Sequence, residues 1–122
     1  MTAPTYPVFV DLAGRRTLVV GGGPIAARRA AGLLEAGARV EVVAPWLCED
    51  LALLVADHRV VWHAREYASG DVDDAWFVHT ATGDPLVDSA VATDSEAARV
   101  WCVRADAASR SAAWTPAVAR GA

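Results

Sequence analysis

The stretch Thr17-Leu18-Val19-Val20-Gly21-Gly22-Gly23-Pro24-Ile25-Ala26-Ala27 decides the fold of this chain. Its first part is a continuous apolar run, which is typical of a parallel strand buried on both faces. Gly21, Gly23 and Ala26 then follow the spacing Gly-x-Gly-x-x-Gly/Ala. The stretch therefore predicts a strand, a tight turn and a helix that begins at the turn.

Each small residue of this turn has a physical task. Gly21 allows the tight turn, Gly23 lets a pyrophosphate approach the backbone, and Ala26 lets the helix pack closely on the strand. Pro24 suits the first helical turn, because its missing N–H would have no intrahelical partner there. The free N–H groups and the positive end of the helix dipole favour a phosphate. The turn therefore predicts dinucleotide binding, with a ligand-free structural turn as the alternative.

Apolar runs alternate with helical patterns along the rest of the chain. The predicted strands span residues 17–20, 39–44, 59–63, 75–81 and 100–104, and the predicted helices span 24–36, 49–56 and 85–98. Gly37 caps the first helix, and the segment 64–74 is irregular and acidic. The alternation predicts a Rossmann-like, doubly wound parallel α/β sheet of about five strands in the order 3-2-1-4-5.

Several apolar side chains have expected places in the core. We expect Val8 and Phe9, in an extended segment before the first strand, to cover one end of it. Trp62, Trp76 and Trp101 lie in strand patterns, so we expect them inside the core.

Composition limits the classes of function. The 122 residues are 54% hydrophobic, which suits one domain with a real core. A net charge of −4 argues against broad nucleic-acid binding, which relies on a basic face. All eleven basic residues are arginine, which excludes lysine Schiff bases and Walker-type phosphate binding. No stretch reads as a signal peptide or as a membrane helix, so we expect a soluble, cytoplasmic protein.

The cysteines and histidines have no metal-type spacing. They are Cys48, Cys102, His58, His63 and His79. Free thiols and structural histidines are the simpler interpretation. Asp71, Asp73 and Asp74 could chelate a cation, although a solvated acidic loop explains them as well. We therefore predict no resident metal site.

Beyond these patterns, the chain resembles the N-terminal module of siroheme synthase, a precorrin-2 dehydrogenase with sirohydrochlorin ferrochelatase activity. Five segments in the same order carry the resemblance. They are residues 6–12, 19–26 and 33–40, Ala81-Thr82-Gly83-Asp84-Pro85-Leu86-Val87-Asp88, and Trp101-Cys102-Val103-Arg104-Ala105-Asp106.

The resemblance implies NAD-dependent oxidation of precorrin-2 to sirohydrochlorin, followed in many members by insertion of ferrous iron. It places the residue most tied to both steps at Asp106, which we expect to act as general base. It places the contacts to NAD at the glycine turn and at the ends of the second and fourth strands. These residues are Gly21, Gly22, Gly23, Pro24, Ile25, Ala44, Pro45, Trp46, Ala81 and Thr82. Ligands of an open parallel sheet bind beyond these strand ends, so the segments should converge on one crevice.

The resemblance also divides the chain. Residues 1–106 would be the NAD-binding domain, and residues 107–122 would be a tail that begins a dimerisation region, so a homodimer is expected. Where the family carries two acids and an asparagine, this chain has Gly83, Asp84 and Asp88. No acid stands at the end of the second strand to bind a ribose, and Glu41, inside that strand, is expected to point elsewhere. Selection of NAD over NADP therefore rests on the resemblance.

Other interpretations stay open for three of these residues. Asp106 could be an ordinary turn or helix-capping residue before Ala107. Arg104 and Arg110 could hold substrate carboxylates by bidentate contacts, or could be solvated surface charges. For the chain as a whole, the alternatives to a dehydrogenase are a non-catalytic NAD-binding or regulatory module and a structural remnant that binds neither ligand.

Overall fold

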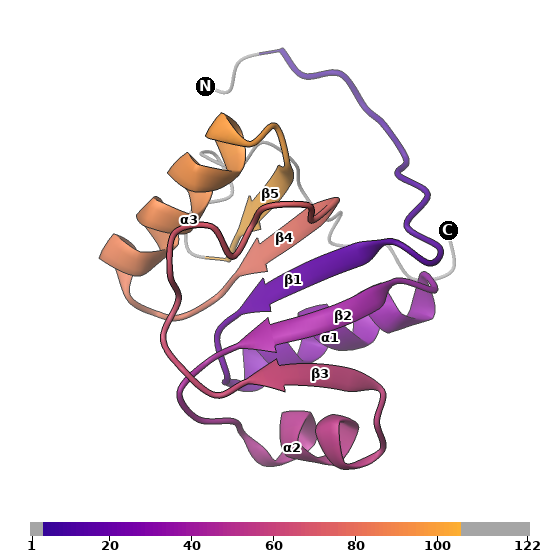
Figure 1. Ribbon diagram of the computed structural model, residues 1–122. Helices are drawn as coiled ribbons and strands as arrows, with labels where there is room; N and C mark the ends of the chain where they lie inside the picture. The colour runs from indigo at the N-terminus through magenta and orange to yellow at the C-terminus, as the bar shows by residue number, and fades with distance from the viewer. Residues whose placement is uncertain (1–3, 106–122) are drawn as a thin grey trace.

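The computed structural model describes residues 4–105, which form a parallel five-stranded sheet with helices on both faces (Figure 1). The strands are β1 (Arg16–Val20), β2 (Arg39–Val43), β3 (Val60–His63), β4 (Phe77–Thr80) and β5 (Trp101–Arg104), and the helices are α1 (Pro24–Glu35), α2 (Glu49–Ala56) and α3 (Pro85–Ala97). Their order across the sheet is β3-β2-β1-β4-β5. This order confirms the predicted Rossmann-like topology.

The sheet separates two apolar clusters. On the face covered by α1 and α2, Val19 packs with Val42, and on the face covered by α3, Leu18 packs with Val91. Leu18 and Val19 are both 0% exposed, as expected for a strand buried on both faces. The strand that leads into the glycine turn is therefore held from two sides.

The three described helices end in the same backbone motif. The residue after each helical C-cap has a positive φ: 80° at Gly37, 58° at His58 and 60° at Arg99. After α1, the amide of Ala38 donates to the carbonyl of Leu33 at 3.1 Å, and equivalent bonds close α2 and α3. Gly37 confirms the predicted cap. The same conformation at His58 and Arg99 costs energy, because their side chains crowd the backbone there.

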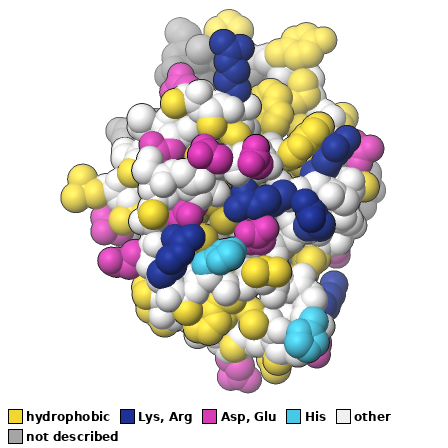
Figure 2. Space-filling model, viewed as in Figure 1, with side chains coloured by type: hydrophobic (Ala, Val, Ile, Leu, Met, Phe, Trp, Pro, Cys, Tyr) yellow, Lys and Arg dark blue, Asp and Glu magenta, His cyan; other side chains and the backbone are white. Residues whose placement is uncertain are grey.

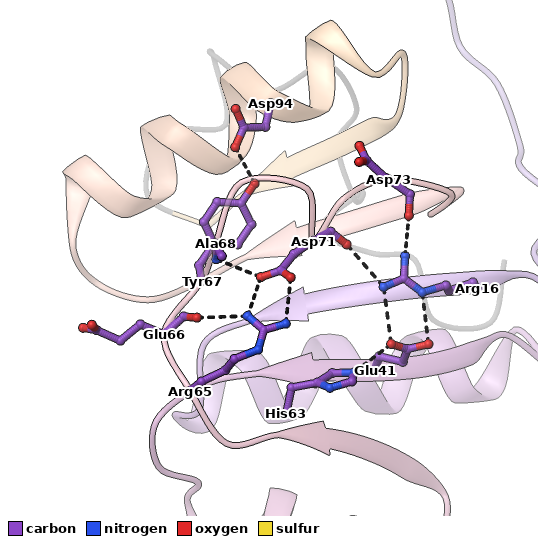
Figure 3. Close-up of polar contacts among 10 residues, drawn as sticks. All are labelled: Arg16, Glu41, His63, Arg65, Glu66, Tyr67, Ala68, Asp71, Asp73 and Asp94. Atoms are coloured by element: carbon purple, nitrogen blue, oxygen red, sulfur yellow. Dashed lines mark hydrogen bonds and ion pairs between the residues drawn. The ribbon is translucent and has the colours of Figure 1, made fainter.

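The connection from β3 to β4 crosses the α3 face of the sheet without forming a helix. The Arg16 guanidinium donates to the carbonyl oxygens of Asp73 at 2.8 Å and Asp71 at 3.2 Å (Figure 3). Arg65 forms two bonds to the Asp71 carboxylate, at 2.8 and 2.7 Å, and these bonds hold the pKa of Asp71 below its ordinary value. Val72, between these anchors, is buried. Arg16 thus fastens this loop to β1, and the bonds between Arg65 and Asp71 close the loop on itself.

The expectation for Val8 and Phe9 is wrong. Phe9 is fully exposed and Val8 is 48% exposed, whereas Leu12 is buried. The amide of Gly14 donates to the carbonyl of Gly37 at 2.9 Å, and among residues 4–105 backbone pairing to the domain begins only after Leu12. No described strand pairs with residues 8–9, so the sheet does not hold their apolar side chains against the core.

The three tryptophans expected in the core are also partly exposed: 36% for Trp62, 46% for Trp76 and 40% for Trp101. Trp62 and Trp101 belong to the two edge strands of the described sheet, and Trp76 lies just before β4. The Trp62 indole donates to the carbonyl of Ala44 at 2.8 Å, and the Arg15 guanidinium lies 4.0 Å from the centre of the Trp76 ring. Strand patterns alone do not distinguish central from edge positions.

Most predicted element boundaries lie within one residue of the observed ones, but β4 is shorter than the predicted span of 75–81. The amide of Ala75 donates to the carbonyl of Val72, within the preceding turn, so strand pairing begins only after Ala75.

None of the helices among the described residues is long and apolar enough to cross a membrane.

Candidate functional site

Three segments of backbone meet at the carboxyl end of the sheet. The amide of Gly21 donates to the carbonyl of Val43 at 3.0 Å, which joins the glycine turn to the end of β2. The amide of Ala81 donates to the carbonyl of Val20 at 2.8 Å, which joins the end of β4 to the end of β1. The structure thus brings together the glycine turn, the 44–46 segment and the 81–82 segment, as the sequence predicts.

Gly21 and Gly22 are required by the protein itself. Gly21 has a φ of 132°, and a Cβ there would overlap the carbonyl group of Ala81. A Cβ on Gly22 would overlap the carbonyl oxygen of Trp46. These glycines let β1, β2 and β4 end in close contact. The contribution of Gly22 is not evident from the Gly-x-Gly-x-x-Gly/Ala spacing, which counts it as a free position.

Gly23 differs from its two neighbours. Its φ of −92° suits any residue, and among the described residues the nearest atom to a Cβ placed there is Cη2 of Trp46, at 3.9 Å. Within residues 4–105, neither backbone conformation nor packing explains a glycine here. A ligand that approaches this backbone closely would explain it, so the residues present fit a dinucleotide phosphate.

The start of α1 has no side-chain cap among residues 4–105. Gly23 is the N-cap and Pro24 is in the first helical turn, as predicted. Because the first N–H groups of a helix have no intrahelical partner, this end can donate to an anion. Ala26, the third small residue of the pattern, is fully buried against the sheet.

Apolar side chains border the open turn. Trp46 is 60% exposed and its ring edge lies close to Gly23, and Ile25 is 44% exposed. Ala44 is buried at the end of β2. The turn therefore combines backbone donors with an exposed aromatic face, which suits a ligand that carries phosphates and flat rings.

The segment after β4 is held by a residue that the sequence analysis did not assign. Asp88, in the first turns of α3, accepts hydrogen bonds from the hydroxyl groups of Thr80 and Thr82 and from the amide of Thr82. Asp88, Val91 and Ser95 are all buried, at the spacing of one helix face. In the sequence, an acidic residue at the same helical spacing as the apolar Val91 could have indicated that Asp88 is buried and hydrogen-bonded.

Glu41 is engaged away from the glycine turn, as expected (Figure 3). Its carboxylate lies 3.0 Å from Nε of Arg16 and 2.9 Å from Nε2 of His63. Burial tends to raise the pKa of Glu41, but the hydrogen bonds from Arg16 and His63 outweigh it and lower the pKa below its ordinary value. Figure 2 shows acidic and basic side chains interspersed on the face turned to the viewer. Glu41 is therefore not placed to bind a ribose.

The remaining charged candidates are an acidic residue of the 64–74 segment and the residues at and after the end of β5. Asp71 is bound by Arg65, and no group of three or more metal-ligating side chains occurs among residues 4–105. Arg104 is buried, and its guanidinium lies 3.4 Å from Oγ of Ser89, so it is not a solvated surface charge. Asp106 and Arg110 lie outside the described residues.

The histidines and cysteines occupy separate places. His79 is buried, and burial together with the nearby charge of Arg29 lowers its pKa to about 3, so it is neutral in the core. Cys48 and Cys102 are free thiols, and burial raises the pKa of Cys102. His79 is therefore a structural histidine, and the Cys102 thiol is harder to ionise than an exposed one.

Comparison with known proteins relates this architecture to characterised families. Residues 8–117 match a family model described as "Putative NAD(P)-binding". Siroheme synthase of Neisseria meningitidis serogroup C is 40% identical over 86 residues, which are 70% of this chain and 18% of that protein. Siroheme synthase 3 of Aeromonas hydrophila is 37% identical over 112 residues, which are 92% of this chain and 24% of that protein.

Among solved structures, the chain is similar to SirC, a precorrin-2 dehydrogenase. The TM-score is 0.76 at 30% sequence identity, and the match covers 93% of this chain and 55% of that one. The chain thus spans about a fifth of the siroheme synthases that it matches and about half of the dehydrogenase.

Proposed function

Because this chain belongs to the NAD(P)-binding family matched by residues 8–117, we propose that it binds NAD across the glycine turn as part of a precorrin-2 dehydrogenase. The phosphates would lie on the backbone of Gly21, Gly22 and Gly23 at the start of α1, beside Pro24 and Ile25. The remaining contacts would come from the ends of β2 and β4. These residues are Ala44, Pro45, Trp46, Ala81 and Thr82.

The geometry of Gly23 carries this proposal. Among the three glycines of the turn, it alone has no backbone atom of residues 4–105 within 4 Å of a Cβ position, and its φ of −92° suits any residue. The Trp46 ring borders the same opening. A turn without a ligand would need glycine at Gly21 and Gly22 and would tolerate a side chain at Gly23.

The proposed reaction is the oxidation of precorrin-2 to sirohydrochlorin in siroheme synthesis. When bound, NAD⁺ would take up one hydride and become NADH, while one proton leaves the macrocycle. We assign that proton to the carboxylate of Asp106, which lies two residues after the end of β5 in the sequence. The amide of Ala105, the residue before it, donates to the carbonyl of Thr80 at 3.0 Å, at the edge of the sheet where NAD would lie.

Further parts of the proposal concern the substrate and the assembly. Arg104 and Arg110 would contact carboxylate groups of the tetrapyrrole. Ferrous iron would be a second substrate if the same site inserts it, since Asp106 could then accept pyrrole N–H protons. A homodimer in the cytoplasm belongs to this proposal as well, and we propose neither a nucleic-acid nor a membrane partner.

The test follows NADH formation by absorbance after precorrin-2 and NAD⁺ are added to the purified protein. We expect the protein to form NADH and its Asp106→Ala variant to lose that activity with the fold intact. Binding of NAD⁺ without oxidation would favour the non-catalytic module. Binding of neither NAD⁺ nor precorrin-2 would favour a structural remnant.

A further inference from the structure

We infer that Asp88 is a positioning residue that holds the 81–82 segment and the end of β5 in register beside the proposed NAD site. The inference rests on the proposed function and adds to it a residue on α3. Asp88 does not belong to the glycine turn or to any strand end.

One carboxylate oxygen of Asp88 collects three hydrogen bonds. Its Oδ1 accepts from Oγ1 of Thr80 at 2.6 Å, from Oγ1 of Thr82 at 2.8 Å and from the amide of Thr82 at 3.2 Å. Thr80 is the last residue of β4, and Thr82 follows two positions later. Asp88 therefore sets where the chain leaves the sheet after β4.

We call the three hydrogen bonds from Thr80 and Thr82 to Asp88 the Asp88 clamp. The surroundings of Asp88 hold this clamp in place. Its side chain is 1% exposed and lies in the first turns of α3, where the helix dipole favours a negative charge. The start of that helix is fixed in turn, because the Asp84 side chain accepts from the amide of Leu86 at 3.0 Å. A buried carboxylate is costly unless it is hydrogen-bonded, so the two threonines and Asp88 depend on one another.

The same clamp extends to β5. The carbonyl of Thr80 accepts the 3.0 Å hydrogen bond from the amide of Ala105, and the guanidinium of Arg104 reaches Oγ of Ser89, next to Asp88 on α3. The first turns of α3 thus touch both strands that end beside the site. Loss of Asp88 should therefore loosen the 81–82 segment beside the proposed NAD site. It should also loosen the backbone at Ala105, which precedes Asp106.

An amide should replace the carboxylate for this purpose. The side-chain oxygen of asparagine can accept the same bonds from Thr80 and Thr82, whereas alanine can accept none. If Asp88 acts by positioning, Asp88→Asn should keep NAD⁺ binding and slow amide exchange, and Asp88→Ala should lose both. If the negative charge is required, both Asp88→Asn and Asp88→Ala should lose NAD⁺ binding.

The experiment compares Asp88→Ala and Asp88→Asn with the unmodified 122-residue chain. One readout is the Kd for NAD⁺ by calorimetry, at a temperature where circular dichroism shows every variant folded. The other is amide hydrogen exchange at Thr82 and Ala105, which needs no ligand. We expect Asp88→Ala to raise the Kd at least tenfold and to speed exchange at both amides. Asp88→Asn should stay within about threefold of wild type in Kd, given the smaller cost of neutral hydrogen bonds.

Asp94→Ala is the matched control. Asp94 also lies on α3 and accepts a 2.6 Å hydrogen bond, from the hydroxyl of Tyr67, on the side of the helix that meets the 64–76 loop (Figure 3). This variant should lose stability but keep the wild-type Kd. A similar rise in Kd for Asp94→Ala would show that general loosening of α3, rather than Asp88, affects the site.

Thr80→Val covers the case in which Asp88→Ala does not fold, because it removes one bond of the clamp and keeps the side-chain shape. It should speed exchange at Ala105 and weaken NAD⁺ binding. Unchanged exchange and Kd in a folded Asp88→Ala or Thr80→Val variant would overturn the inference. Wild-type chain that binds no NAD⁺ would instead refute the proposed function, while the exchange rates would still decide whether Asp88 holds the two segments.

Discussion

The amide nitrogen of Cys48 lies 2.7 Å from the carbonyl oxygen of Gly22, so the segment after β2 is hydrogen-bonded directly to the turn after β1. This bond draws the backbone of Trp46 against Gly22 and leaves no room there for a Cβ. At the next residue, Gly23, a Cβ would meet only Cη2 of Trp46 among the described residues, at an ordinary contact distance of 3.9 Å. Two adjacent glycines thus serve different purposes, and substitution can separate them.

Alanine at these two positions should have opposite effects. Gly22→Ala forces a Cβ into the carbonyl of Trp46 and should destabilise the fold by about 1–3 kcal/mol. Gly23→Ala should cost less than about 1 kcal/mol, mainly from a poorer N-cap, yet raise the Kd for NAD⁺ at least tenfold. Urea unfolding and calorimetry measure the two quantities. If Gly23→Ala binds NAD⁺ like wild type, the phosphates do not lie on this turn.

The buried His79 should make the fold sensitive to mild acid. Its pKa in the folded chain is about 3, against an ordinary 6.5, so below pH 6.5 the unfolded chain takes up a proton that the folded chain refuses. Stability should therefore fall as the pH falls from 6.5 towards 3, by about 2 kcal/mol from this group between about pH 7.5 and pH 5.

Unfolding free energies of wild type and His79→Leu across this range measure that contribution. The unfolding free energy should depend less on pH in His79→Leu than in wild type. His58→Asn, a substitution at an exposed position, serves as the control and should show the wild-type pH dependence. Equal pH dependence in wild type and His79→Leu would contradict a neutral, buried His79.

Glu41 should contribute to stability and not to the choice of nucleotide. Because the pKa of Glu41 is lowered by folding, its contribution is present above its ordinary pKa and is lost as the pH falls through the lowered value. Glu41→Gln should cost about 1–2 kcal/mol near pH 7 through its charged hydrogen bonds with Arg16 and His63, and less in acid.

Glu66→Gln, at an exposed position in the loop, serves as the control and should change stability little. The ratio of the Kd values for NAD⁺ and NADP⁺ should be the same in wild type and Glu41→Gln. A change in that ratio would mean that Glu41 reaches the ribose after all.

Glycine after α3 should stabilise the chain. Arg99 has a φ of 60° in the capping motif, and a glycine there avoids the crowding of its Cβ. We expect Arg99→Gly to raise the free energy of unfolding by about 0.5–1 kcal/mol. Arg28→Gly, at an exposed position inside α1, should lower it by about 1 kcal/mol. A loss of stability in Arg99→Gly would show that its side chain contributes more than the strain removes.

Much of this architecture could be predicted because it depends on local signals. The apolar run before Gly21, the glycine at position 37 and the proline at position 85 each mark the end or start of an element, and the alternation of strands and helices leaves few topologies. The convergence of the glycine turn with the 81–82 segment follows from that topology, since parallel strands end at one edge.

The missed features depend on contacts between distant segments. The exposure of Phe9 and Trp101 depends on what lies beside an extended segment or an edge strand. The need for glycine at Gly22 arises from Trp46, which is far along the chain. The role of Asp88 depends on Thr80 and Thr82 meeting the inner face of α3. Spacing within one element contains none of this information.

The burial of β1 on both faces has a mechanical consequence for whatever binds at its end. Because Leu18 and Val19 pack into separate clusters on the two faces of the sheet, the glycine turn continues from a strand that is held on both sides. A ligand seated there would meet a preformed rather than an adaptable surface, so little of its binding energy would be spent on ordering the protein.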